Sequence, residues 1–184
     1  MKHRYYYLVA SLPSLYLEVP PPVRRDEFLA MCKRYVKKND FALLESINML
    51  DLKQKDISSG VLGDFFNFES RLRNALAELR SQRLGFAVEN CAGNDISDHE
   101  QMLIAEEALH APSPLKAEEI LNKARWRYLD ELEFGHYFDR DRLVVFFIKL
   151  QILERIALFD AERGLRTLQS ILDLDPVKAH YFNA

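Results

Sequence analysis

The sequence predicts an all-α fold, a bundle of several helices with an extended, proline-rich strap at its N-terminus. Apolar residues recur at helical spacing through two long stretches, 61–84 and 139–164, and the alternating pattern typical of strands is almost absent. The second stretch, DRDRLVVFFIKLQILERIALFDAERG, has so broad an apolar face that other helices must cover it. We therefore expect it at the centre of the bundle.

Composition favours a single domain spanning residues 1–184, since a chain of 184 residues with 48% hydrophobic content can bury a sizeable core. Cys32 and Cys91 lie far apart without a CxxC motif, which indicates reduced thiols. The net charge of -3 does not suggest a nucleic-acid partner. Residues 1–50 hold eight Lys+Arg against five Asp+Glu, a local +3 that we interpret as a solvated surface.

The first elements are a strap and two helices. RYYYLVASLPSL, residues 4–15, is apolar and aromatic but short for an independent helix, and the prolines at positions 13 and 20–22 favour extended backbone up to Arg25. Asp26 is the expected N-cap of a helix to about residue 36. Asn39 or Asp40 is expected to begin the next one, to about residue 50.

After a polar loop, the stretch 61–84 is expected to be one long helix that ends at Gly85. A loop over 91–96 precedes a helix over 98–110, for which Ser97 and Glu100 form a capping box. Ser113 and Pro114 open a helix to about residue 134, and a last amphipathic segment covers about 165–174. A weak likeness between 65–85 and 146–165 fits either two related units, 1–90 and 91–184, or two unrelated amphipathic helices.

Charged residues on the apolar faces are the main candidates for structural ion pairs. Glu69 occupies a core position, and a buried carboxylate without a partner costs several kcal/mol. Lys149 or Arg155 of the central stretch is its expected partner. The charges would then fix helix register, and the alternative is that they contact another protein. The candidate set is Glu69, Lys149, Glu154 and Arg155.

No catalytic residue, cofactor or metal ligand is predicted. The glycines form neither of the usual phosphate-binding loops, and the five histidines belong to no catalytic triad pattern. Glu107-x-x-His110 and Glu133-x-x-His136 match the helical spacing of di-iron bundles. In an antiparallel hairpin the two copies would stand about 28 Å apart, too far to share a metal.

Four segments together resemble a bacterial family, described mostly as uncharacterised, that is encoded among the subunits of V-type ATPases. They are RYYYLVASLPSL, FNFESRLRNALAELRSQRLG, WRYLDEL and HYFDRDRLVVFFIKLQILER. The family is similar to the C/d subunit, an all-helical component that sits on the rotor ring and receives the central stalk. That component carries an Asn-Leu-Lys element. Here Asn74 holds a comparable place, but Ala75 and Leu76 follow, so the lysine is missing, and the chain is shorter.

The resemblance implies a non-catalytic accessory or coupling subunit of a V-type proton- or sodium-translocating ATPase, cytoplasmic and peripheral to the inner membrane. Its implied partners are the central stalk, the rotor ring or both. The most apolar run, 143–153, is about half the length of a membrane helix and includes Lys149, so no membrane span is expected. The alternatives are an ATPase assembly or regulatory factor and a small helical metalloenzyme of the ExxH type. The expected contact residues are Tyr5, Tyr6, Tyr7, Arg73, Asn74, Arg80, Trp126 and Asp130.

Overall fold

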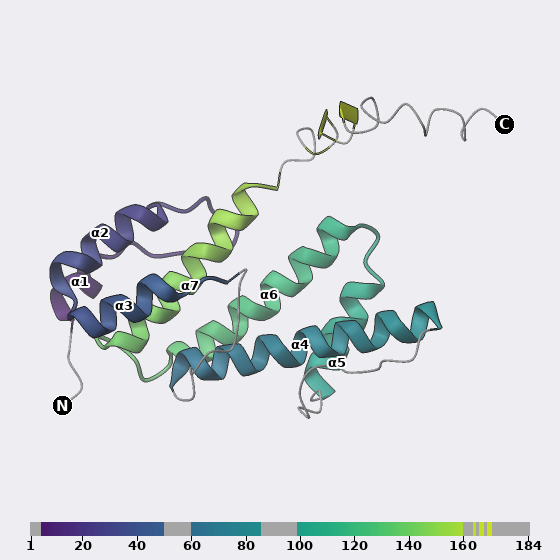
Figure 1. Ribbon diagram of the computed structural model, residues 1–184, viewed down its shortest axis with the longest axis horizontal. Coiled ribbons are helices and arrows are strands. Elements are labelled where there is room, and N and C mark those ends of the chain that lie inside the picture. Colours follow the sequence, from purple (N-terminus) through teal and green to yellow (C-terminus); the bar gives the residue numbers. More distant parts are fainter. Residues whose placement is uncertain are drawn as a thin grey trace.

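The computed structural model describes residues 5–49, 60–85 and 99–159, together with Gly164, Arg166, Thr167, Gln169 and Ser170. Within these residues the chain is a bundle of seven helices without strands, which confirms the predicted all-α fold (Figure 1). None of the described helices is long and apolar enough to cross a membrane. The helices are α1 Tyr6–Ser11, α2 Arg25–Tyr35, α3 Lys38–Ser46, α4 Val61–Leu84, α5 His99–Leu109, α6 Pro114–Glu133 and α7 Arg140–Ala157.

Several sequence predictions fall outside the described residues. These are most of the loop at 51–60, the loop at 91–96 with Cys91, the capping residue Ser97, and most of the segment 165–174.

The N-terminal strap is non-helical from residue 12 to residue 24, as predicted, but the tyrosines before it begin a short helix. The backbone N–H of Tyr5 donates to the carbonyl of Phe138, and Leu8 on α1 is buried in the main core. A helix of six residues is not stable through its own propensity. Packing against the rest of the bundle therefore accounts for α1, and local sequence does not reveal it.

Helices α2 and α3 differ from prediction at their ends because α7 binds the neighbouring backbone. Helix α2 begins at Arg25, before the expected cap Asp26, and the backbone N–H of Arg25 donates to Glu154 Oε1 over 2.6 Å. Helix α3 starts at Lys38 and stops at Ser46, short of the predicted residue 50. The Gln151 amide donates to the Ile47 carbonyl over 3.1 Å and accepts from the Met49 N–H over 3.0 Å, which holds this segment extended.

The remaining helices follow the sequence signals closely. Helix α4 has the predicted bounds, and Gly85 takes the left-handed conformation at its C-cap with φ of 72°. Helix α6 starts at Pro114, with Ser113 Oγ accepting from the Lys116 N–H over 3.2 Å. Helix α7 begins after Asp139, which caps it, but it ends at Ala157 and not at the predicted Gly164.

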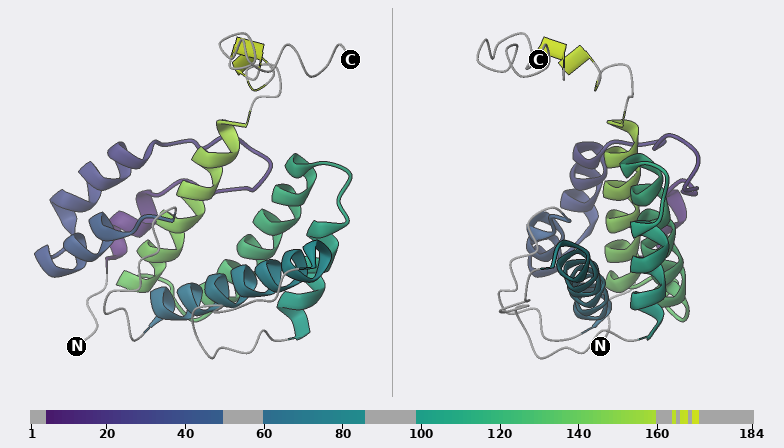
Figure 2. Two further views of the ribbon diagram at one scale, coloured as in Figure 1. Left: turned by 45° about the vertical axis from the view of Figure 1, so that its right-hand side comes forward. Right: turned by 90° about the vertical axis from the view of Figure 1, so that its right-hand side faces the viewer.

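The core consists of two hydrophobic clusters. The first surrounds α7 with α1, α2, α3 and the start of α4, and the second lies between the rest of α4, α5 and α6. Figure 2 shows α7 between the α2–α3 pair and α6, and α4 packs against α6 and α7. Both clusters draw on both halves of the chain, so neither coincides with a unit over 1–90 or 91–184. That division stays a prediction.

Candidate partner-binding surfaces

A buried ion pair joins α4 to α6 at the position where the sequence places an acid among apolar residues. The Glu69 side chain is 1% exposed, and both its oxygens are bound by Arg125, Nε to Oε2 over 2.8 Å and Nη2 to Oε1 over 3.1 Å. Arg73 adds a third contact, Nε to Oε1 over 2.9 Å. Among the described residues, Glu69 thus forms its ion pairs with Arg125 and Arg73, and not with Lys149 or Arg155, the partners that the sequence analysis expected. Arg155 is close enough to interact with Glu69 electrostatically but is not directly paired with it.

The ion pair continues into a chain of charges that reaches α7. Arg125 Nη1 donates to Glu118 Oε1 over 2.9 Å, and the Arg155 guanidinium pairs with the same carboxylate. Burial lowers the pKa of Arg155, while nearby Glu69 raises it. Three helices are thus tied together by alternating charges. Because each buried charge needs its neighbour, the network fixes the positions of α4, α6 and α7 relative to one another.

Lys149 forms a second polar cluster between α6 and α7. Its ammonium donates to Asp130 Oδ1 over 2.6 Å, also binds Glu133, and lies 5.4 Å from the centre of the Trp126 ring. Burial lowers the pKa of Lys149, and the contact with Asp130 opposes this shift. Arg142 pairs with Glu133, so two cations face two carboxylates. These four groups and residues 12–16 of the strap line a cavity of about 270 Å³.

Glu154, the fourth residue expected in an ion pair, has a different role among the described residues. Its carboxylate accepts from the backbone N–H of Arg25, at the first turn of α2. A carboxylate is favourable at this position because the free N–H groups of a helix start carry a partial positive charge. Glu154 therefore fastens α2 to α7 through a helix end.

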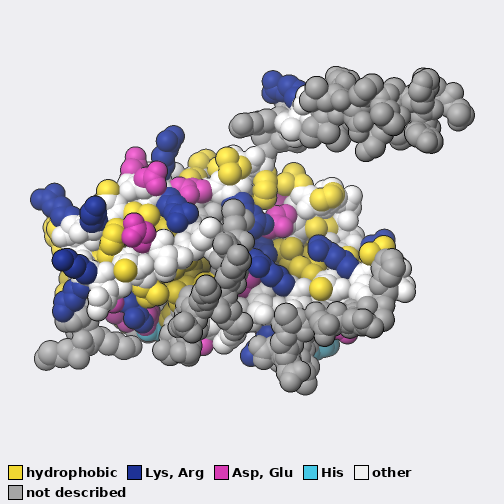
Figure 3. Space-filling view, viewed as in Figure 1, with side chains coloured by type: hydrophobic (Ala, Val, Ile, Leu, Met, Phe, Trp, Pro, Cys, Tyr) yellow, Lys and Arg dark blue, Asp and Glu magenta, His cyan; other side chains and the backbone are white. Residues whose placement is uncertain are grey.

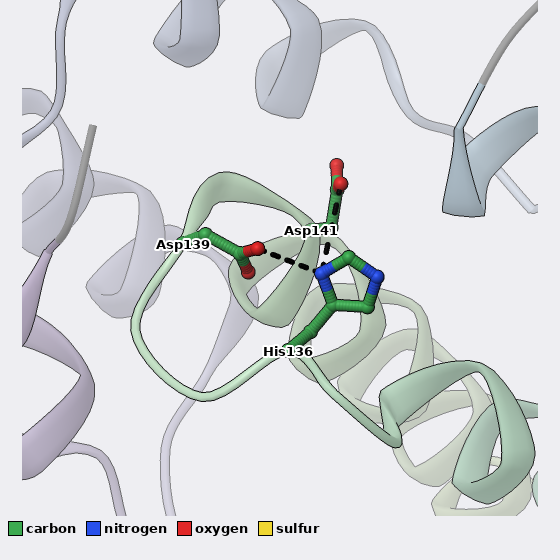
Figure 4. A group of neighbouring side chains, drawn as sticks. All are labelled: His136, Asp139 and Asp141. Carbon is green, nitrogen blue, oxygen red and sulfur yellow. Dashed lines mark hydrogen bonds and ion pairs between the residues drawn. The ribbon is translucent and has the colours of Figure 1, made fainter. Parts of the chain in front are cut away.

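His136, Asp139 and Asp141 meet at the turn between α6 and α7, a cluster that the sequence analysis missed (Figure 4). His136 Nδ1 lies 2.7 Å from Asp139 Oδ2 and 3.8 Å from Asp141 Oδ2. Three such groups can offer ligands to a metal ion. Here Asp139 also caps α7 through the Arg142 N–H over 3.1 Å, and Asp141 binds Arg140, so the contacts hold the turn in place. Glu133, the acid of the second ExxH motif, binds Lys149 and is not part of this cluster.

The tyrosines expected to contact a partner divide into a buried one and two exposed ones. The Tyr5 hydroxyl donates to Asp40 Oδ2 over 2.5 Å, and burial together with this hydrogen bond raises its pKa to about 12. Tyr6 and Tyr7 are 49% and 70% exposed. Tyr5 therefore anchors α1, while its two neighbours face outward.

Exposed aromatic side chains gather where α1, the end of α2 and the α6–α7 turn meet. The Tyr6 ring lies 4.7 Å from the Phe138 ring, and the Tyr7 ring lies 5.2 Å from the Tyr35 ring. Single exposed apolar residues are common, but several exposed aromatic residues on neighbouring elements indicate a binding surface. We call this group the aromatic end. It comprises Tyr6, Tyr7, Tyr35, Phe134, Tyr137 and Phe138.

A second apolar surface lies at the other end of α7. A cleft of about 430 Å³ opens between the strap, the start of α6 and the end of α7. Leu17, Leu115, Ile156 and Phe159 supply its apolar wall, and Leu158 beside it is 72% exposed. The rest of the lining is polar and consists of Glu18, Lys116, Glu119, Asn122 and Lys123. We call this the apolar cleft. Helix α7 has 18 residues, so the two surfaces are separated by about 27 Å of helix.

The other expected contact residues are spread over the bundle. Arg80 is exposed on α4, while Arg73 binds Glu69 with half of its side chain still exposed. The carboxamide nitrogen of Asn74 is buried and has no hydrogen-bond partner among the described residues. Trp126 packs on the first cluster, and Asp130, with a side chain 56% exposed, is held by Lys149. These residues do not form one surface.

The second half of the chain matches a known protein family. A family model described as a protein of unknown function, DUF2764, matches residues 100–175, which is fewer than half of the 184 residues. The matched stretch includes most of α5 and all of α6 and α7, with Arg125, Lys149 and the turn at His136. Neither a curated protein nor a solved structure matches the chain.

Proposed function

We propose that the protein is a non-catalytic coupling or accessory subunit of a V-type ATPase, similar to the C/d subunit. The proposal comes from the four sequence segments that resemble the ATPase-associated family. The observation that carries it is that one helical bundle presents two surfaces with exposed apolar side chains, the aromatic end and the apolar cleft, at opposite ends of its central helix. A coupling element needs two contact surfaces of this kind.

Rigidity between the two surfaces is the second requirement, and the buried charges supply it. Glu69, Arg125, Glu118 and Arg155 join α4, α6 and α7. Gln151 and Glu154 bind the backbone of the segments next to α3 and α2. A body packed at interior density with its helices tied in this way transmits displacement with little internal deformation.

The polar cluster at Lys149 favours a structural role over an enzymatic one. An active site keeps its acid and base groups available to substrate. Here the Lys149 ammonium contacts both Asp130 and Glu133, and Glu133 also binds Arg142. The four groups neutralise one another across the α6–α7 interface.

Co-purification tests the proposal. An affinity-tagged full-length chain, produced in its native host from the chromosomal locus, is expected to bring down stalk or rotor subunits of the ATPase. A photo-crosslinking amino acid at position 7 and another at position 158 are expected to label different neighbours, because these positions lie at opposite ends of α7. A crosslinker at exposed position 127 serves as the control.

The outcomes separate the proposal from its alternatives. A chain that joins only incomplete ATPase particles, and is absent from the finished enzyme, is an assembly factor. An ATPase that assembles and pumps normally after deletion of this chain, with no ATPase subunit among the co-purified proteins, contradicts the proposal.

A further inference from the structure

We propose that the aromatic end binds the surface of a membrane containing anionic phospholipids. The inference names a partner for one of the two surfaces in the proposed function. It rests on the charges and aromatic rings of that surface and can be tested in the absence of any ATPase.

The first observation is a group of cations beside the aromatic end. Four basic residues occupy the end of α2 and the start of α3, and all four are exposed: Lys33, Arg34, Lys37 and Lys38. In the space-filling view, Lys and Arg side chains are concentrated along the left edge of the molecule, where Figure 1 places the α2–α3 junction (Figure 3). The sequence excess of three positive charges in residues 1–50 is thus partly concentrated on one surface.

The second observation is that the basic residues lie next to aromatic rings. The Arg34 guanidinium lies 5.4 Å from the centre of the Tyr35 ring, which is 5.2 Å from the Tyr7 ring. Tyr6, next in the chain, contacts Phe138 of the α6–α7 turn. In that turn Phe134 is 86% exposed and Tyr137 is 67% exposed. Tyr35 and Tyr7 therefore lie beside Arg34, and the α6–α7 turn contacts the same helix, α1, through Phe138.

The third observation concerns the acids near this surface. Asp40 accepts the Tyr5 hydroxyl, Asp139 binds His136 and caps α7, and Asp141 binds Arg140. Each is turned toward a partner within the protein. The remaining acids of α2 and α3, Asp26, Glu27 and Glu45, lie toward the far ends of those helices. Asp40 and Asp139 keep their negative charges and Asp141 is paired with Arg140, so the four exposed cations outnumber two uncompensated carboxylates and the local charge is positive.

Cations with exposed aromatic rings match the chemistry of an anionic bilayer surface. Tyrosine is enriched at the level of the lipid headgroups, where its ring meets apolar chains and its hydroxyl meets water. Basic residues near the surface are attracted to anionic headgroups, and this attraction falls off within a Debye length. The inferred contact is with the surface of the bilayer, as for other segments that place aromatic and basic side chains among the headgroups.

Vesicle sedimentation with the full-length protein tests the inference. Vesicles of phosphatidylcholine and phosphatidylglycerol at a ratio of about 3:1 are expected to bind the protein, and pure phosphatidylcholine vesicles are expected to bind it at least about tenfold less. Raising the salt to about 0.5 M is expected to release the protein, since screening is then strong.

Two sets of variants locate the binding surface. Lys33→Ala/Arg34→Ala/Lys38→Ala is expected to weaken binding to the anionic vesicles roughly tenfold or more. Tyr7→Ser/Tyr137→Ser is expected to weaken it several-fold through loss of ring insertion. The control Lys116→Ala/Lys123→Ala/Arg127→Ala removes the same charge from exposed positions on α6 and is expected to bind like the unmodified protein. Circular dichroism and thermal unfolding confirm that each variant is folded.

Equal losses in the α2–α3 variant and the α6 control would overturn the inference, as would equal binding to neutral and anionic vesicles. Binding to soluble polyglutamate without binding to vesicles would also overturn it and would indicate an acidic protein partner. ATPase co-purification can succeed or fail independently of each result, because the vesicles contain lipid alone.

Discussion

The two hydrophobic clusters of the bundle are stabilised in different ways. In the first, the Phe28 ring stacks on Phe146 and Phe147, with ring centres 5.2 Å apart in both pairs. In the second, the buried apolar residues are mainly leucines and alanines, and the Glu69–Arg125 pair lies among the helices that form it. The first cluster contains several buried phenylalanines among its aliphatic side chains. The second has one, Phe68, which stacks on Tyr128 with ring centres 4.2 Å apart, and combines it with smaller side chains and buried charge.

The contrast shows how differently the two clusters depend on single residues. Aromatic burial is non-directional, so it tolerates small displacements of the surrounding helices. A buried ion pair is directional and requires both partners. Two further polar atoms in the second region, Asn74 Nδ2 and Gln101 Oε1, are buried without a hydrogen-bond partner among the described residues. The second cluster therefore depends more on the correct pairing of its polar groups.

Phe147→Ala tests the aromatic cluster and is expected to have the largest effect. Phe147 is fully buried, and its truncation leaves a large cavity next to Phe28. We expect a loss of about 4 kcal/mol in the free energy of unfolding, measured by urea titration. Leu72→Ala in the second cluster is the matched comparison and is expected to cost less, since fewer atoms are removed. An equal or greater loss for Leu72→Ala would contradict the comparison.

Glu69→Gln tests the buried charge and is expected to cost about 3 kcal/mol, because it keeps the shape of the side chain but leaves the Arg125 charge unpaired. Glu119→Gln makes the same change in an ion pair with Lys116 that is largely exposed, and it is expected to change stability by less than about 0.5 kcal/mol. Urea titration measures both.

The double variant Glu69→Leu/Arg125→Met sharpens this test. Removing both charges is expected to cost less than Glu69→Leu alone, since no uncompensated charge is left behind. A double variant whose loss equals the sum of the two single losses would show that the residues act independently.

Lys149→Met is expected to have a smaller effect, about 1 kcal/mol or less. Burial lowers the pKa of Lys149, so desolvation of its ammonium already costs stability, and a methionine of similar shape avoids that cost. Of its partners, Asp130 is 56% exposed and can be hydrated, and Glu133 keeps Arg142. Thermal unfolding at pH 7 measures the change. A loss as large as that of Glu69→Gln would mean that both polar clusters are equally essential.

Tyr5→Phe is expected to have an effect as small as that of Lys149→Met at neutral pH, about 1 kcal/mol from the lost hydrogen bond to Asp40. The Tyr5 pKa rises from 10.0 to about 12 on folding, so the unfolded chain loses this proton first. The stabilisation that protonated Tyr5 gives to the folded protein is present below pH 10 and is lost as the pH rises toward 12. In urea titrations between pH 9 and 12, the free energy of unfolding should fall less with rising pH for Tyr5→Phe than for the unmodified protein. The buried Cys32 thiol, whose pKa is also raised to about 12, affects both proteins alike.

Most helix bounds were predictable because local chemistry sets them. Gly85 ends α4, Ser113 and Pro114 begin α6, and Asp139 caps α7, each as the sequence indicates. Besides the end of α7, the predictions missed α1, the first residue of α2 and the end of α3. In these three places the deciding contact comes from residues far along the chain, namely Phe138, Glu154 and Gln151.

By itself the sequence determined that the protein is helical, that Glu69 occupies a core position, and that the tyrosines near the N-terminus need a surface to pack against. The tertiary structure decided that Arg125 neutralises Glu69, that Tyr5 is buried while Tyr7 is exposed, and that basic residues of α2 and α3 lie beside exposed aromatic rings. The physical reason is the distance along the chain over which each interaction acts. Helix propensity and capping act within a few residues, whereas pairing of charges and burial of rings depend on which helices become neighbours.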